Sequence, residues 1–259
     1  MKRWTGLLLA ILLLGFPVSG RADTKSDPWA PLTDIANQIY QSIDQGRNET
    51  ASGFLKTFEK KWNALKDKDD KLPGESVRAL TASEEKLKIA LKNATEQDPI
   101  KEAATEFRLA VDAMTSREHP LWIGMKDRVL AQYSKVQKDV AQGNDAAFQH
   151  DLNQFSDLYQ MIYPSLVIDI ASAKITKVDA EINYLLNHRM TIVQDKNREL
   201  SHLKALATDL NSLFQKDTQK LSTPLIKIGV VIGGFIMATL MLAAWRKYEG
   251  ERARKGDTK

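Results

Sequence analysis

Side chains that could carry out chemistry are few in this sequence and far apart along it. The four histidines are His119, His150, His188 and His202, and the chain contains no cysteine. His188 and His202 could share a helix face only if one helix ran through both, and neither is followed by His or Glu at a spacing of three or four. A helical zinc pair requires that spacing. The sequence therefore predicts no metal site.

A cluster of aspartates resembles a calcium loop only in part. Asp67, Asp69 and Asp70 alternate with Lys68 and Lys71. A calcium loop of the EF-hand type needs a glycine at its sixth position and a closing glutamate that wraps the ion, whereas lysines interrupt this run. We therefore expect a charged, solvated loop here.

The common catalytic motifs are missing from the sequence. It contains no G-x-S-x-G nucleophile elbow, no glycine-rich phosphate loop and no H-E-x-x-H zinc motif. A hydrolase acting on the cell wall would need a carboxylate pair for acid and base catalysis, and no such pair is recognisable. The sequence consequently predicts a protein that is not an enzyme, with no catalytic residues and no cofactor.

The elements that position the side chains are predicted to be helices throughout. Apolar residues, including the aromatic ones, recur at spacings of three and four, which is the period of an amphipathic helix. Turn and cap residues separate these segments at Gln45-Gly46, at Leu72-Pro-Gly74 and at Asp98-Pro99, where Asp98 is expected to be the N-cap. We expect an all-α fold of about eight helices, antiparallel where the loops are short.

The first helical hairpin recurs later in the chain. A shift of 97 residues places Gln45-Gly46 on Gln142-Gly143, and it superposes two sets of apolar positions. Leu32, Ala36, Ile39, Ile43, Leu55, Phe58 and Trp62 fall on Val129, Tyr133, Val136, Val140, Leu152, Phe155 and Tyr159. Such a repeat indicates either an internal duplication or two copies of one packing solution. Both predict αα-hairpins in each of two candidate halves, 29–117 and 120–218.

Pro164 marks the point where the second half departs from this pattern. Tyr163-Pro164-Ser165 is expected to end a helix, and the stretch from Leu166 to Ile170 is too apolar for an exposed loop. Because no partner strand is evident, we interpret this stretch as an extended connector pressed onto the helices, with helix resuming near Ser172. Ordered non-helical segments often carry specific surfaces. The candidate interaction surface is therefore Tyr163, Pro164, Ser165, Leu166 and Asp169.

Residues 225–245 are predicted to cross a membrane. Lys227 is their one charged residue, and a helix of 21 residues spans the roughly 30 Å hydrocarbon core. Residues 1–22 have the form of a secretory signal peptide, with an uncleaved second anchor as the alternative. The tail, 246–259, is basic, and short basic segments stay cytoplasmic. These patterns predict a single-pass protein of the cell membrane with residues 23–224 outside the cytoplasm and the C-terminus inside.

Charge and composition narrow the range of partners. The whole chain has a net charge of +4, but positions 23–224 contain 27 basic and 30 acidic residues. The basic excess lies in the terminal segments, so no nucleic acid partner is expected. An exported chain without cysteine has no disulfide framework, which favours a bacterial envelope protein. In the predicted span, Gly229 and Gly233 form a GxxxG that could pair two copies as a homodimer; glycine simply tolerated in lipid is the alternative.

Short sequence motifs between positions 120 and 190 resemble those of a known family. They are Pro120-Leu-Trp122, Leu152-Asn-Gln-Phe155, Leu158-Tyr159, Ile162-Tyr-Pro-Ser-Leu166, Ile168-Asp169, Val178-Asp-Ala180 and Arg189. With the layout of signal peptide, helical ectodomain, late transmembrane helix and basic tail, they are similar to the YpjB family of sporulation proteins of endospore-forming bacteria. The resemblance implies a process and a location, and it brings no catalytic residues. From the residues themselves, we expect Trp122 to anchor the core and Asn153 and Asp169 to bond exposed backbone.

These features together predict a membrane-anchored, non-enzymatic helical scaffold or protein-interaction module with a protein partner in the envelope and a role in sporulation. The alternative is an extracytoplasmic sensor that binds a small ligand. Such a sensor would signal through a separate partner, because the basic tail is too short for an output domain.

Overall fold

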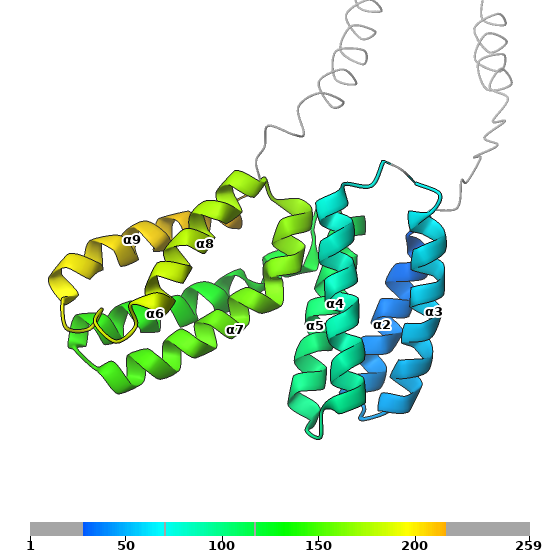
Figure 1. Ribbon diagram of the computed structural model, residues 1–259, viewed down its shortest axis with the longest axis horizontal. Helices are drawn as coiled ribbons and strands as arrows, with labels where there is room; N and C mark the ends of the chain where they lie inside the picture. Colours follow the sequence, from blue (N-terminus) through cyan, green and yellow to red (C-terminus); the bar gives the residue numbers. More distant parts are fainter. Residues whose placement is uncertain (1–27, 70, 117, 216–259) are drawn as a thin grey trace, which may run out of the picture. The chain divides into compact units, whose positions relative to one another are not determined.

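The computed structural model describes residues 28–69, 71–116 and 118–215. Within these ranges it contains eight α-helices, one short 3-10 helix and no strand (Figure 1). The prediction of an all-α fold with about eight helices is confirmed. The elements are α2 (Ala30–Asp44), α3 (Asn48–Lys66), α4 (Gly74–Asn93), α5 (Gln97–Thr115), η1 (Leu121–Met125), α6 (Lys126–Gln142), α7 (Asp145–Asp169), α8 (Ser172–Asn187) and α9 (Lys196–Leu213).

The chain divides into two compact units, residues 1–210 and residues 211–259. The first unit holds α2 to α8 and most of α9, and the second is described only from 211 to 215, which includes the last residues of α9. None of the described helices combines the length and the hydropathy that a membrane span requires. The predicted signal peptide, membrane span and tail, together with Gly229 and Gly233, lie outside the described residues.

Helices α2 to α5, which we call the first bundle, pack around one apolar core. Helix α2 packs on α3 and α5, and α4 packs on α5 (Figure 1). The apolar faces expected for these helices are buried, with Ile39, Phe58, Trp62 and Phe107 fully enclosed. The rings of Phe58 and Phe107 meet edge to face with centres 4.8 Å apart, a geometry that aromatic pairs prefer. The period of the apolar residues thus gives the core of this bundle directly.

Helices α6 and α7 form a hairpin with the same turn as α2 and α3. Gly46 and Gly143 have φ of 72° and 71°, in the left-handed region that favours glycine. The amide of Gly46 donates to the carbonyl of Ile43 (2.9 Å), as that of Gly143 does to Val140 (3.1 Å). The next amide in each turn donates to the residue before that acceptor, which completes a Schellman motif. All fourteen apolar positions paired by the shift of 97 residues are buried in both hairpins.

Helix α7 does not end at Tyr163-Pro164-Ser165, where the sequence predicted a break. It continues with Pro164 inside it as far as Asp169, and Ile170 is the first extended residue. An interior proline costs a helix about 3 kcal/mol, since it removes an N–H and crowds the preceding turn. Here Pro164 and its neighbours Ile162 and Leu166 are buried, and α7 packs on both α4 and α5, which outweighs that cost. The prediction of an extended connector from Leu166 to Ile170 was wrong.

Two further local predictions need correction. Helix α5 begins at Gln97 rather than after an Asp98 cap, because the Gln97 side chain donates to the carbonyl of Ile43 at 2.7 Å and ties the helix start to α2. Asp169 accepts a hydrogen bond from the Trp122 indole (2.9 Å), and Asn153, expected to bond exposed backbone, accepts one from the Arg189 side chain (3.0 Å). Trp122 itself is buried in η1, directly before α6, which confirms it as a core anchor.

Candidate functional site

Two tyrosines of α7 and one aspartate of α8 form the best-defined polar group on the surface of the helices. Tyr159 and Tyr163 are four residues apart, so they share one face of α7. The Tyr159 hydroxyl donates to one oxygen of Asp179 at 2.8 Å, and the Tyr163 hydroxyl donates to the other at 3.1 Å. The two rings lie edge to face with centres 5.8 Å apart. The carboxylate is therefore held at both oxygens.

The electrostatics of this group favour binding over proton transfer. Burial raises the pKa of the Tyr159 phenol above its ordinary value, and the hydrogen bond to Asp179 raises it further. Burial likewise raises the pKa of Tyr163, with the negative charge of Asp179 as the next cause. Both phenols consequently remain protonated near neutral pH and act as donors to the carboxylate. A phenol in that state is not a general base.

Asp179 has no positively charged partner among the described residues. Ion pairs form elsewhere in the described part of the chain, for example between Lys177 and Asp209 at 2.8 Å, but none includes Asp179. The side chain of Asp179 is half-buried, so part of its hydration is lost. Two neutral hydroxyls thus fix a carboxylate whose charge is not neutralised.

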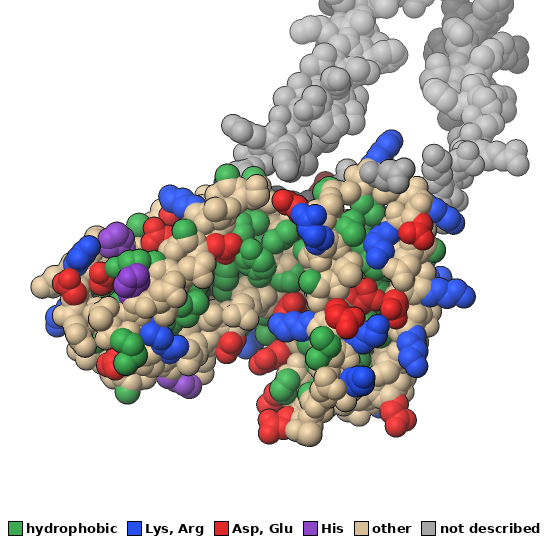
Figure 2. Space-filling view, viewed as in Figure 1, with side chains coloured by type: hydrophobic (Ala, Val, Ile, Leu, Met, Phe, Trp, Pro, Cys, Tyr) green, Lys and Arg blue, Asp and Glu red, His purple; other side chains and the backbone are tan. Residues whose placement is uncertain are grey.

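This carboxylate lies in a groove between α4, α7 and α8. The main part has a volume of about 450 Å³, and a hollow of about 270 Å³ between α7 and α8 adjoins it, because Tyr163 and Asp179 line both. Figure 2 shows apolar side chains gathered where these three helices meet. The larger part is lined by Glu75, Arg78, Ala79 and Ala82 of α4, by Tyr163, Pro164 and Val167 of α7, and by Ser172, Ile175, Thr176 and Asp179 of α8.

The interaction surface proposed from the sequence is divided by this arrangement. Tyr163 and Pro164 line the groove. Ser165 and Leu166 are fully buried, and Asp169 bonds the Trp122 indole. Reasoning from the sequence missed Asp179 and the wall contributed by α4. A signal for Asp179 existed in Val178-Asp-Ala180, one of the short motifs that carry the family resemblance.

The histidines take no part in this groove. His188 directly follows α8 and His202 lies on α9, and their ring centres are 4.3 and 5.8 Å from that of Tyr184. The Tyr184 hydroxyl donates to the buried Glu199 at 3.1 Å. No group of three or more side chains suited to a metal ion occurs in the described residues. In the aspartate-rich loop, Asp69 accepts a hydrogen bond from the Lys71 amide, and Asp70 lies outside the described residues.

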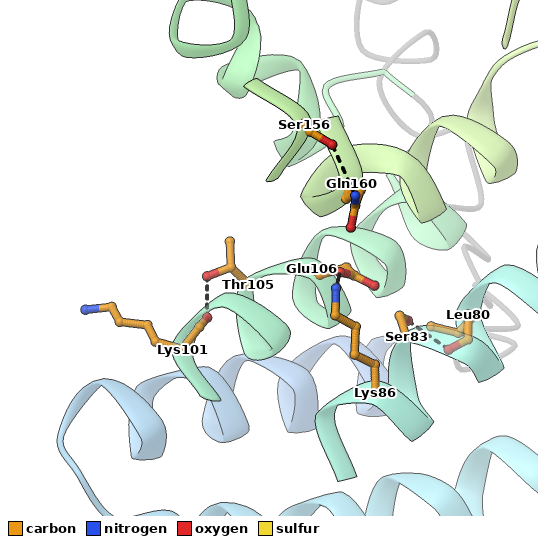
Figure 3. A network of polar contacts seen from close by, with 8 residues as sticks. All are labelled: Leu80, Ser83, Lys86, Lys101, Thr105, Glu106, Ser156 and Gln160. Atoms are coloured by element: carbon orange, nitrogen blue, oxygen red, sulfur yellow. Dashed lines mark hydrogen bonds and ion pairs between the residues drawn. The ribbon is translucent and has the colours of Figure 1, made fainter. Parts of the chain in front are cut away.

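A second polar contact lies where α4, α5 and α7 come together. Figure 3 shows Lys86 of α4 reaching Glu106 of α5, near Ser156 and Gln160 of α7. Glu106 is 6% exposed, and this burial raises the pKa of its carboxyl against the opposing effect of Lys86. Both charges are paired with each other, so this contact holds helices together and leaves no free charge for a ligand.

The fold and the groove define an all-α protein with a partly apolar groove in which two tyrosines fix one carboxylate. A family model described as Sporulation protein YpjB (SpoYpjB) matches residues 29–257, and the chain belongs to that family. The protein YpjB of Bacillus subtilis (strain 168) is 27% identical over 256 residues, which are 97% of this chain and 96% of the relative. No solved structure matches the chain.

Proposed function

We propose that this protein is a membrane-anchored, non-enzymatic helical interaction module that acts in sporulation by docking a protein partner in the groove between α4, α7 and α8. The observation that carries the proposal is the carboxylate of Asp179, which two tyrosines hold in the groove and which forms no ion pair with a described residue. Membership of the sporulation protein YpjB family supports the process.

The proposed location rests on the sequence patterns at the two ends. A signal peptide over 1–22 and a span over 225–245 would place the described helices outside the cytoplasm, tethered by one helix. A reporter enzyme that is active only after export tests this: fused after Lys259, it should be inactive. An active fusion would overturn the orientation.

A role in binding rather than catalysis is supported by the state of the groove. Its two phenols have raised pKa values and donate to Asp179, so they are occupied as donors. Its apolar side chains, such as Ala82 and Ile175, offer area that becomes favourable to bury when a partner covers it.

The decisive experiment blocks the groove without disturbing the core. Ala82 is exposed on α4 and lines the groove, so Ala82→Trp fills it with an indole. Ile89 lies on the same helix, is 51% exposed and does not line the groove, so Ile89→Trp is the matched control. In a strain lacking the gene, spore yield should fall, and the control should restore it while the blocked variant does not. Full restoration by Ala82→Trp at normal protein level would refute the proposal.

A second candidate function is a sensor that takes a small ligand. It is favoured by the convergence of Tyr159, Tyr163 and Asp179 on a hollow of about 270 Å³, which is small enough for a compact molecule. Native mass spectrometry of the full chain separates the two candidates: a sensor would retain a bound small molecule, whereas an interaction module would not.

A further inference from the structure

We infer that the partner presents a lysine or arginine side chain to Asp179, with apolar side chains beside that residue seated along the groove. The inference rests on the proposed function and names the chemistry of the partner segment. It follows from what the carboxylate still lacks, from the aromatic rings around it, and from the apolar walls that continue away from it.

The carboxylate has acceptor capacity left for a cation. An ionised carboxylate offers about four lone-pair positions, and the hydroxyls of Tyr159 and Tyr163 fill two of them. The hollow around it contains no basic residue in its lining, which is Ser156, Tyr159, Gln160, Tyr163, Asp179, Ile182, Asn183 and Leu186. A cationic group entering this hollow would therefore meet one negative charge and no positive one.

The tyrosine rings add to the attraction for a cation. A lysine or arginine head group is stabilised by an aromatic ring when it lies over the face of the ring, within about 6 Å of the ring centre. Both hydroxyls bond Asp179, so the carboxylate lies at the hydroxyl edges of the two rings, and a long side chain that reaches it passes close to the exposed ring of Tyr163. Tyr159 is almost fully buried and Tyr163 is 37% exposed, which leaves Tyr163 as the side that a partner can reach.

The adjoining part of the groove suits apolar side chains. Ala79 and Ala82 of α4 are small and leave room, while Pro164, Val167 and Ile175 supply apolar surface on α7 and α8. Among the described lining residues, Arg78 is the one base, and it comes from α4 rather than from α8. A polypeptide segment with a basic residue flanked by apolar ones therefore matches the groove in charge and in polarity, as an amphipathic segment does in other grooves.

Peptide selection on the full chain tests this inference. Random peptides about 16 residues long are displayed and selected on immobilised protein, and those that also bind the Ala82→Trp variant are removed. The expected peptides share a lysine or arginine flanked by Leu, Ile, Phe or Val. Replacing that base with glutamine, or replacing Asp179 with asparagine, should weaken binding about tenfold or more.

Matched variants separate the charge from the fold. Asp179→Asn keeps the size of the side chain, and Thr176→Lys places a cation three residues before Asp179 on the same helix, where it can neutralise the carboxylate. Asp157→Asn is the control, because Asp157 is an exposed α7 residue that lines a different hollow. Binding should fall in the first two variants and persist in the third, with the helical circular dichroism unchanged in all three.

Three outcomes would overturn the inference. The selected peptides could lack a shared base, or they could bind Asp179→Asn as tightly as the wild type. In the third case, n-butylammonium would displace a selected peptide at the same concentration at which it displaces a peptide whose base has no apolar neighbours. The last result would point to a small-cation site. After either of the first two outcomes the proposed function would still stand if Ala82→Trp fails to restore spore yield, since that variant tests the groove and not the charge.

Discussion

Replacing Glu84 by glutamine should remove a pH-dependent loss of stability from the first bundle. Glu84 lies on α4 and is 7% exposed, although it has no ion pair among the described residues. Burial raises the pKa of its carboxyl from 4.5 to about 7, the negative charge of Glu59 adds to this effect, and Lys66 and Lys88 oppose it. The folded protein therefore retains a proton that the unfolded chain has already released.

The sign and size of the effect follow from this difference. Between pH 4.5 and pH 7 the folded state binds more protons at Glu84 than the unfolded state, so the free energy of unfolding falls as the pH rises through that window. At full strength the shift would correspond to roughly 3 kcal/mol. Because water still reaches part of the carboxyl and screens its charge, we expect about 1–2 kcal/mol.

Urea unfolding followed by helical circular dichroism at pH 5, 6, 7 and 8 measures this effect. Glu84→Gln should match the wild type at the acidic end and exceed it by about 1–2 kcal/mol at pH 8. Glu102→Gln, an exposed carboxyl on α5, serves as the control and should follow the wild-type curve. Parallel curves for the wild type and Glu84→Gln across the whole range would refute the reasoning.

Two other predictions concern the turns and α7. Gly46→Ala and Gly143→Ala should each destabilise the protein by about 1 kcal/mol, and by the same amount, because both glycines have positive φ and an added Cβ meets nothing within 4 Å. Gly53 lies within α3 and has equally open surroundings, so Gly53→Ala should instead stabilise the protein by about 0.5–1 kcal/mol. Denaturation midpoints that shift in the same direction for all three variants would contradict the turn assignment. Ser165→Ala should be neutral or stabilise the protein by up to about 1 kcal/mol, since the fully buried Ser165 hydroxyl has no hydrogen-bond partner among the described residues. A clear loss of thermal stability would show that the hydroxyl has a partner.

Much of the fold can be predicted from the sequence, because the local preferences of the residues agree with the packing of the helices. Positive φ at Gly46 and Gly143 could be expected from a glycine after an apolar helix, and the buried faces follow the helical period. Pro164 is the point where the two disagree. The local preference of proline favours a helix end, but burial of the surrounding residues on α4 and α5 decides the outcome, and that packing is not visible from neighbours in sequence.

The groove was only half visible for a similar reason. Tyr163 and Pro164 could be selected because they stand at an unusual point in the chain. Asp179 looks like any exposed acidic residue of an amphipathic helix until α8 folds back on α7 and brings it to the two phenols. The wall from α4 is about a hundred residues away in sequence, and no pattern local to either segment indicates that they meet.

The continuity of α7 has a consequence for how the protein unfolds. This helix of 25 residues packs on α6 and α8 and also on α4 and α5, so it contributes to the core of the first bundle and to that of the helices after it. If either group of helices unfolds, the other loses apolar contacts with α7, which predicts one cooperative unfolding transition rather than two. The groove adjoins the C-terminal part of α7, so a partner bound there would raise the thermal stability of both halves together.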